Sequence, residues 1–169
     1  MENHQIFHIV AASGDQMVIG NNNDLPWPKF SSDLKHFRTT TAGSTVIMGR
    51  HTFESIGNKP LPNRQNIVLS HGQIPVPDGV TLCNSFDEAI EKANQEKIFV
   101  IGGGEIFKQT IDKVDQIIMT YIPMEYPGNV YYPQIPEYFK KIQSESLPTL
   151  PDEPKAERVF YINSKKYPR

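Results

Sequence analysis

The sequence predicts an α/β protein built around a mainly parallel β-sheet. Short apolar runs typical of buried strands alternate with segments of helical pattern from the N-terminus to Thr120. Glycines stand at several points where an apolar run ends and a helical segment begins. Beyond Thr120 the pattern becomes rich in strands, which are expected to pair antiparallel at one edge of the sheet.

The strands are predicted from short apolar runs bounded by turn residues. Buried strands are expected at Ile6–Ala12, Thr45–Met48, Asn66–Leu69, Val80–Cys83, Ile98–Ile101 and Gln116–Ile122. Two further strands are expected at the antiparallel edge, at Tyr138–Leu147 and Val159–Lys165.

Helices are predicted between these strands. The first runs from about Ser32 to Thr40, with Ser31 or Ser32 as its N-cap and Gly43 beyond its end. In the helix expected from Ser85, Ser85 and Glu88 have the spacing of a capping box, in which a hydroxyl and a carboxylate satisfy the free N–H groups of a helix start. The second, third and fourth helices are expected after Gly49, from Ser85 and after Gly104.

Composition bounds the class of protein. The chain has 169 residues, of which 38% are hydrophobic and 21% charged, as expected of one folded domain spanning residues 1–169. A net charge of −2 gives no general attraction for nucleic acid or an anionic membrane. Cys83 is the only cysteine, no Lys or Arg precedes Lys29, and no apolar stretch approaches the ~20 residues of a membrane span. We therefore expect a cytoplasmic protein.

Two glycine junctions are candidate phosphate sites. In Ile98–Phe107 a strand, three glycines and a helix follow one another, so that backbone N–H groups could face an anion. The dinucleotide pattern G-x-G-x-x-G fails, because Phe107 stands where its third glycine belongs. A tight turn without a ligand remains the alternative.

The second junction is Thr45–Thr52, where a strand ends at Gly49 and a helix starts with Arg50, His51 and Thr52. Cations oppose the dipole of a helix start, and a bound anion would offset that repulsion. Two such junctions in one sheet could hold one elongated anionic ligand. A dinucleotide with an extra phosphate fits, and Arg50 would favour NADPH over NADH.

Asp33 is the candidate acid. It shares a helix face with Phe37, and Leu34 lies beside it. One interpretation is a first-turn acid that only stabilises the helix dipole. The other is a carboxylate in an apolar pocket, which could bind an amidine-like ring edge and help a proton reach the substrate.

Several stretches together resemble the dihydrofolate reductase family, from Phe7 to about Asn163. They are Val10-Ala-Ala, Val18-Ile-Gly, Leu25-Pro-Trp, Asp33-Leu, Val46–Gly57, Leu61–Ser70, Val100–Phe107 and Thr120. The resemblance implies an eight-stranded, mostly parallel mixed sheet flanked by four helices, with an antiparallel C-terminal edge. It also implies a cis peptide between Gly102 and Gly103.

The resemblance implies reduction of 7,8-dihydrofolate to tetrahydrofolate, with a hydride from NADPH to C6 of the pterin and a proton to N5. Asp33 would hold the pterin and assist protonation, supported by Thr120, with Leu25 and Trp27 completing the catalytic set. Arg64 would bind the carboxylate of the glutamate tail. The substrate would contact Val10, Ala11, Asp33, Leu34, Phe37, Ile56, Leu61, Arg64, Ile101, Phe107 and Thr120.

NADPH is the implied cofactor, and Ser13–Lys29 the implied mobile lid over its nicotinamide. The cofactor would contact Ala12, Val18, Ile19, Gly20, Asn23, Asp24, Leu25, Gly49, Arg50, His51, Thr52, Leu69, Ser70, His71, Gly102, Gly103, Gly104, Glu105, Ile106, Phe107 and Gln109. The implied partners are dihydrofolate and antifolate inhibitors, with no metal, nucleic acid or membrane, and the implied state is a monomer. Asn129 and Asn84 depart from common members near the lid and the adenine.

Three alternatives stay open on the sequence. A reductase of the same fold could act on a ribosylated pyrimidine, although Asp33, Leu25-Pro-Trp and Arg64 favour folate. A binding module would bind NADPH without turnover. A metal hydrolase would need His4 and His8, which are four residues apart but have no Cys/His cluster around them.

Overall fold

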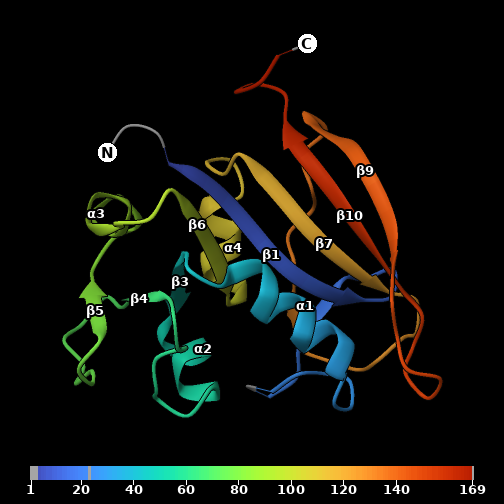
Figure 1. Cartoon of the computed structure of the whole chain (residues 1–169), viewed down its shortest axis with the longest axis horizontal. Coiled ribbons are helices and arrows are strands. Elements are labelled where there is room, and N and C mark those ends of the chain that lie inside the picture. The colour runs from blue at the N-terminus through green and yellow to red at the C-terminus, as the bar shows by residue number, and fades with distance from the viewer. Residues whose placement is uncertain (1–3, 23, 169) are drawn as a thin grey trace.

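A ten-stranded mixed sheet forms the centre of the computed structural model, which describes residues 4–22 and 24–168 (Figure 1). Eight strands follow one another in the order β5-β4-β3-β6-β1-β7-β10-β9, and β2 and β8 lie off this path. The strands are β1 Gln5–Ser13, β2 Val18–Gly20, β3 Thr45–Gly49, β4 Gln65–Leu69, β5 Val80–Cys83, β6 Lys97–Gly102, β7 Gln116–Ile122, β8 Val130–Tyr131, β9 Phe139–Leu147 and β10 Ala156–Asn163. The helices are α1 Ser31–Thr41, α2 Arg50–Ser55, α3 Phe86–Lys92 and α4 Gly104–Thr110.

The strand directions confirm the predicted class. The strands from β5 to β7 are parallel along the main path, whereas β10 pairs antiparallel with both β7 and β9. The short strands β2 and β8 were not predicted, because three and two residues are too few to show an alternating pattern. The implied cis peptide between Gly102 and Gly103 is present.

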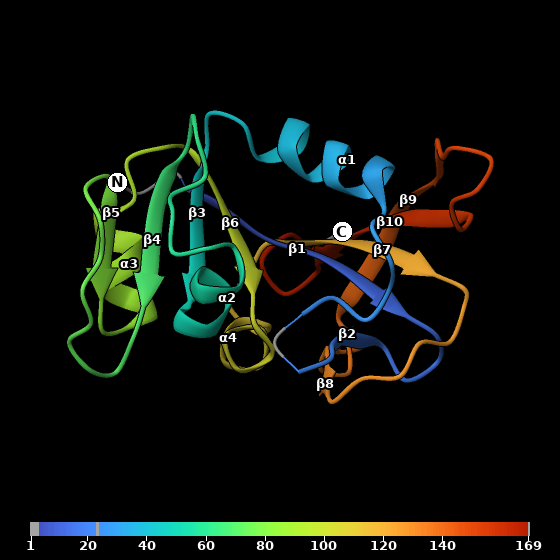
Figure 2. The ribbon, with the colours of Figure 1, turned by 90° about the horizontal axis from the view of Figure 1, so that it is seen from below.

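The two faces of the sheet carry separate apolar clusters. On one face Phe86 of α3 and Phe107 of α4 pack with Ile47 and Val100. On the other, Phe53 of α2 packs with Val46, Met48 and Phe99, with Phe37 of α1 at its margin. Neighbouring residues of β3 thus point to opposite faces, as strand geometry requires. Figure 2 shows α1 lying along the sheet near β1, β7 and β10.

The helix starts differ from prediction in one case. For α3 the cap is confirmed, since the Ser85 hydroxyl accepts from the Glu88 N–H at 3.1 Å. For α1 the expectation that Ser31 or Ser32 is the N-cap is wrong. Phe30 occupies that position and offers no side-chain cap, and a carboxylate from the β9–β10 loop takes over its role.

The strand ends also differ in detail. β10 begins at Ala156, before the predicted Val159, and ends at Asn163, before the predicted Lys165. The reason is that Ala156 pairs with Leu147 of β9 in a buried cluster, although charged residues follow it in the sequence. No helix in the described part of the chain is both long and apolar enough to span a bilayer.

Candidate active site

Asp33 lies partly buried in the first turn of α1, opposite Thr120 of β7. Burial raises the pKa of its carboxyl to about 6, while the Thr120 hydroxyl and the charge of Arg158 act in the opposite direction. Thr120 itself is buried. A carboxyl group with this pKa can exist in both protonation states near neutral pH, which suits proton transfer.

Apolar side chains flank this carboxyl group. Phe37, Ile56, Leu61 and Ile101 are each partly buried and pack against the same cluster on the α1 face. Leu34 and Leu25 are large apolar residues that remain exposed, at 40% and 49%. Val10 and Phe107, which were also predicted to contact the substrate, lie in the cluster of the α3–α4 face.

Arg64 lies just before β4, in the same part of the molecule as the C-terminal end of α1. Its Nη1 donates to the Thr41 hydroxyl at 2.9 Å and its Nε donates to the Pro62 carbonyl at 2.9 Å. Partial burial and the neighbouring Arg38 guanidinium lower the pKa of Arg64. Two guanidinium groups that repel each other form a suitable site for a carboxylate.

The two glycine junctions meet in the structure. β3 and β6 are parallel neighbours, so Gly49 and Gly102 end up side by side. A Cβ atom on Gly49 would lie 3.8 Å from the Gly102 carbonyl oxygen, and one on Gly102 or Gly103 would lie 3.3 or 3.4 Å from the Thr52 hydroxyl. Gly102 has φ +130°, a conformation that side chains disfavour. The two junctions therefore lie next to each other in the sheet.

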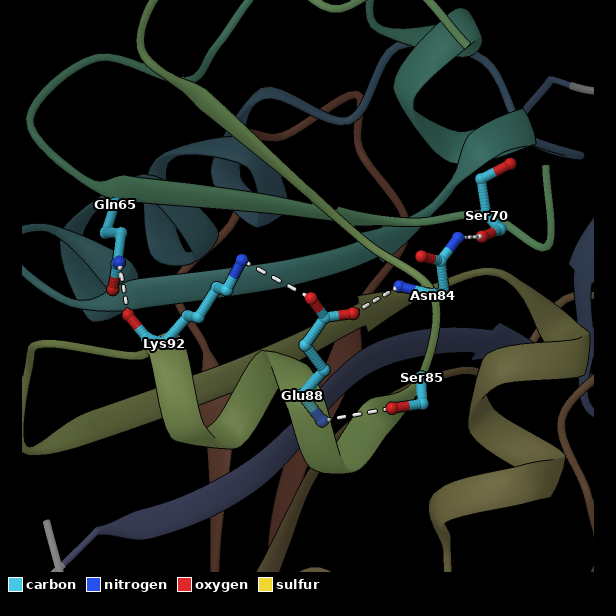
Figure 3. A network of polar contacts seen from close by, with 6 residues as sticks. All are labelled: Gln65, Ser70, Asn84, Ser85, Glu88 and Lys92. Atoms are coloured by element: carbon cyan, nitrogen blue, oxygen red, sulfur yellow. Dashed lines mark hydrogen bonds and ion pairs between the residues drawn. The ribbon is translucent and has the colours of Figure 1, made fainter. Parts of the chain in front are cut away.

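The end of β4 adds a third element to this edge. Ser70 follows the strand, and the Asn84 amide donates to its carbonyl oxygen at 2.9 Å (Figure 3). The Glu88 carboxylate accepts from the Asn84 N–H at 2.8 Å and pairs with Lys92 at 3.3 Å. The position of Ser70 therefore depends on a network that starts from the cap of α3.

Arg50 and His51 extend from the first turn of α2 with side chains 49% and 71% exposed. Both lie near the Glu54 carboxylate, at 3.6 and 3.4 Å. They remain accessible to a bound anion. The remaining predicted cofactor residues lie along β1, β2, the end of β4 and α4: Ala12, Val18, Ile19, Gly20, Leu69, His71, Gly104, Glu105, Ile106 and Gln109. Asp24 bridges to Asn21, and Asn23 lies outside the described residues.

Many known proteins are similar to this chain in sequence or in fold. Residues 6–163 match the sequence profile of the family described as dihydrofolate reductase. The chain is 44% identical to a dihydrofolate reductase of Haemophilus influenzae over 130 residues, which are 76% of this chain and 79% of that protein. A dihydrofolate reductase of Staphylococcus aureus is 40% identical over 125 residues, 74% and 76% of the two chains.

The chain belongs to the dihydrofolate reductase family. Its fold also matches a solved dihydrofolate reductase from Enterococcus faecalis, complexed with NADP(H) and RAB-propyl. That likeness has a TM-score of 0.87 at 28% identity and covers 95% of this chain and 96% of the other. The family agrees with the resemblance on which the site residues were predicted.

Within this dihydrofolate reductase fold, a pair of amides joins the predicted lid to the segment before β8. The Asn22 N–H donates to Asn129 Oδ1 at 3.1 Å, and Asn129 Nδ2 donates to Asn22 Oδ1 at 3.1 Å. The Asn129 N–H also donates to the Gly20 carbonyl at 2.9 Å. Both partners of this pair are neutral, so the contact does not depend on the protonation of either residue.

Sequence reasoning missed three residues near Asp33. The Glu153 carboxylate accepts from the Ser31 and Ser32 N–H groups at 2.7 and 3.3 Å. Arg158 and Glu145 form an ion pair on β10 and β9. No local signal marks Glu153, and Arg158 stands just before the predicted strand Val159–Lys165, among charged residues that gave no sign of burial.

The metal-hydrolase alternative finds no support in the described residues. His4 contacts the Gln95 carbonyl, while His8 is buried between Tyr132 and Thr110. Within residues 4–22 and 24–168, no three His, Cys, Asp or Glu side chains come together in a way that could hold a metal ion.

Proposed function

We propose that this chain reduces 7,8-dihydrofolate to 5,6,7,8-tetrahydrofolate with NADPH, as a monomeric enzyme of one-carbon metabolism in the cytoplasm. The observation that carries the proposal is the Asp33 carboxyl group, whose pKa is raised to about 6 at the margin of an apolar cluster. Membership of the dihydrofolate reductase family supports the choice of substrate.

The substrate side follows from the residues around Asp33. The ionised carboxylate accepts hydrogen bonds from the amino and ring N–H groups of the pterin, and a carboxylate is well matched to such a paired donor edge. Leu34, Phe37 and Ile56 enclose the flat apolar part of the substrate. Arg64 binds the carboxylate of the glutamate tail, which offsets the repulsion between Arg64 and Arg38.

Proton delivery to N5 depends on the same group. A carboxyl group with a pKa of about 6 takes up and releases a proton more readily near neutral pH than one at its ordinary value of 3.8. Thr120 orients Asp33 from β7. The Trp27 indole N–H is buried and finds no acceptor among the described residues, so it is available to a substrate atom or a bound water.

The residues proposed to bind the cofactor offer hydrogen-bond donors and a cation that match the phosphates of NADPH. The converging junctions at Gly49 and Gly102 bring backbone close to the Thr52 hydroxyl, which suits a phosphate. Arg50, with His51 and Ser70 nearby in the fold, holds the additional phosphate of the adenosine ribose. When bound, the cofactor supplies the hydride that reaches C6 of the pterin.

The segment Ser13–Lys29 acts as the lid in this proposal. Val18 and Gly20 of β2 pair with β8, and the Asn22–Asn129 amides tie the tip of the segment to the same region. Closing this segment over the nicotinamide excludes water and orients the two rings. Antifolate inhibitors are expected to bind in place of the substrate.

The test is NADPH oxidation on addition of dihydrofolate, followed by absorbance for the wild type, Asp33→Asn and Asp87→Asn. Asp87 is the matched control, because it is a first-turn aspartate of α3 away from the site. We expect steady oxidation by the wild type and Asp87→Asn, and a loss of at least about 10²-fold for Asp33→Asn, the usual scale for a lost proton-transfer group.

Two other outcomes would each change the assignment. If the wild type binds NADPH but does not turn over dihydrofolate, the folate proposal fails, and the alternatives become a reductase of a ribosylated pyrimidine or a binding module without turnover. If Asp33→Asn retains full activity, the proposed chemistry of Asp33 is wrong.

A further inference from the structure

A row of side chains crosses the sheet near α1. Ala11, Thr120, Arg158 and Glu145 are successive cross-strand partners on β1, β7, β10 and β9. Because directly paired residues point to the same face of a sheet, these four side chains share one face. The row therefore links Thr120, the partner of Asp33, to an ion pair at the edge of the sheet.

The segment entering α1 shows which face carries the row. Trp27 and Phe30 are buried against Ile122, Leu147 and Ala156, and Ala11 packs on the same cluster. Ile122, Leu147 and Ala156 each stand two positions from a member of the row on the same strand, so their side chains point to the same face as the row. α1 thus lies over the row, as its place near β7 and β10 in Figure 2 indicates.

Arg158 is the charged centre of this row. Its Nε donates to Glu145 Oε1 at 2.7 Å, and its Nη2 lies 2.6 Å from the same oxygen. The Arg158 side chain is 13% exposed and that of Glu145 39% exposed, so the cation is the more buried partner. A largely buried cation is less screened by solvent than an exposed one, and its field therefore extends to nearby groups.

That field reaches α1. Asp33 and His36 are three residues apart and lie on one side of the helix. The charge of Arg158 lowers the pKa of both residues, although burial is the larger influence on each. This agrees with the placement of the guanidinium beneath the first turns of α1.

We infer that Arg158, held by Glu145 in the cross-strand row beneath α1, is a positioning residue that acts on Asp33 through the Thr120 row. The inference deepens the proposed function and rests on the role given there to Asp33. The negative charge of Glu145 partly offsets the influence of the Arg158 charge on Asp33.

The other charged groups near Asp33 do not change state in the same pH range. Burial lowers the pKa of His36 to about 4, so His36 is neutral while Asp33 titrates at about 6. Glu153, at the start of α1, has a pKa lowered by its hydrogen bond from Ser32 and stays ionised. Thr120 carries no charge. The Arg158–Glu145 pair is thus the group whose alteration should move the titration of Asp33.

The experiment measures the titration midpoint of Asp33 by carboxyl ¹³C NMR on the unliganded full-length protein, with Asp33→Asn used to assign the signal. We expect Arg158→Gln to raise the midpoint by about half a pH unit to one unit, since it removes a nearby opposite charge. We expect Glu145→Gln to lower the midpoint by a smaller amount, because the charge of Arg158 is then no longer offset.

Two control variants remove the same kinds of charge from the opposite face of the same two strands. Lys141 of β9 pairs with Tyr161, and Glu157 of β10 pairs with Tyr121, and both are exposed. Lys141→Gln and Glu157→Gln should leave the midpoint unchanged. Arg158→Lys, which keeps the charge, should remain close to the wild type. The pH profile of dihydrofolate reduction should move in the same directions as the NMR midpoints.

The inference is supported if Arg158→Gln and Glu145→Gln shift the Asp33 midpoint in opposite directions. Both variants break the same ion pair, so the loss of a purely structural contact would shift the midpoint in the same direction in both. Equal shifts in one direction, no shift, or a Lys141→Gln shift as large as that of Arg158→Gln would overturn it. If Arg158→Gln does not fold, Glu145→Gln and Arg158→Lys still decide the question. The NMR titration does not require turnover, so failure of the proposed function would appear separately, as absence of dihydrofolate reduction.

Discussion

Asp33 and His8 are both titratable groups shielded from solvent by the same sheet, yet their surroundings differ. His8 is fully buried on the α4 side, and both ring nitrogens have protein partners at 2.7 Å. Asp33 sits on the α1 side beside Thr120 and next to exposed apolar residues. A buried group with every hydrogen bond satisfied stabilises the fold, whereas a partly exposed group that can still bind a ligand is available for chemistry.

The partners of His8 also fix its protonation. The Thr110 hydroxyl donates to the Ile106 carbonyl at 2.7 Å, so its oxygen accepts from the His8 Nε2–H. The other ring nitrogen, Nδ1, is then left to accept from the Tyr132 hydroxyl. Burial lowers the pKa of His8 to about 3, so the ring is neutral at physiological pH.

The largest effect is expected for His8→Ala. Its loss creates a cavity and leaves the Tyr132 hydroxyl without a partner, so we expect unfolding to become easier by about 3–4 kcal/mol. Urea unfolding measures the change. Activity per folded molecule should stay near the wild-type value, and a specific loss of activity with unchanged stability would show that His8 is not merely structural.

Asp33→Asn should have the opposite effect on stability. The folded-state pKa of about 6 exceeds the ordinary value of 3.8, so the folded protein binds more protons between these values. The stabilising contribution of Asp33 protonation is therefore present below pH 3.8 and is lost as pH rises through about 6.

At pH 7 the wild type then carries the penalty of a buried charge that Asp33→Asn lacks. We expect the unliganded variant to be more stable by about 1–3 kcal/mol at that pH, with the gap closing as the pH falls toward about 4. Urea midpoints across this range test the expectation. A destabilised variant at pH 7 would mean that Asp33 mainly supports the start of α1.

The smallest effect is expected for Thr110→Val, which removes the acceptor of the His8 Nε2–H while preserving shape. We expect a loss of about 1 kcal/mol, less than that for His8→Ala. Thr110→Ser keeps the hydroxyl and is the control. Equal stability of the valine and serine variants would contradict a stabilising role for this hydrogen bond.

Local sequence was sufficient wherever the interacting groups are close in the chain. Ser85 and Glu88 are three residues apart, and their cap was predicted and is present. The glycine junctions after β3 and β6 were also predicted, because a strand, a glycine and a helix start are adjacent in the sequence. Family resemblance added the strand count of the main path and the cis peptide.

The surroundings of Asp33 were decided by the tertiary structure. Its helix is capped by Glu153, and its ionisation is affected by Arg158, both from the far end of the chain. The sequence identified Asp33 as a candidate but left its role open between a helix-start acid and a buried carboxyl group. Burial and long-range charge exist only once β7, β10 and α1 are packed together, which is why the pKa of Asp33 could not be predicted from its neighbours in the sequence.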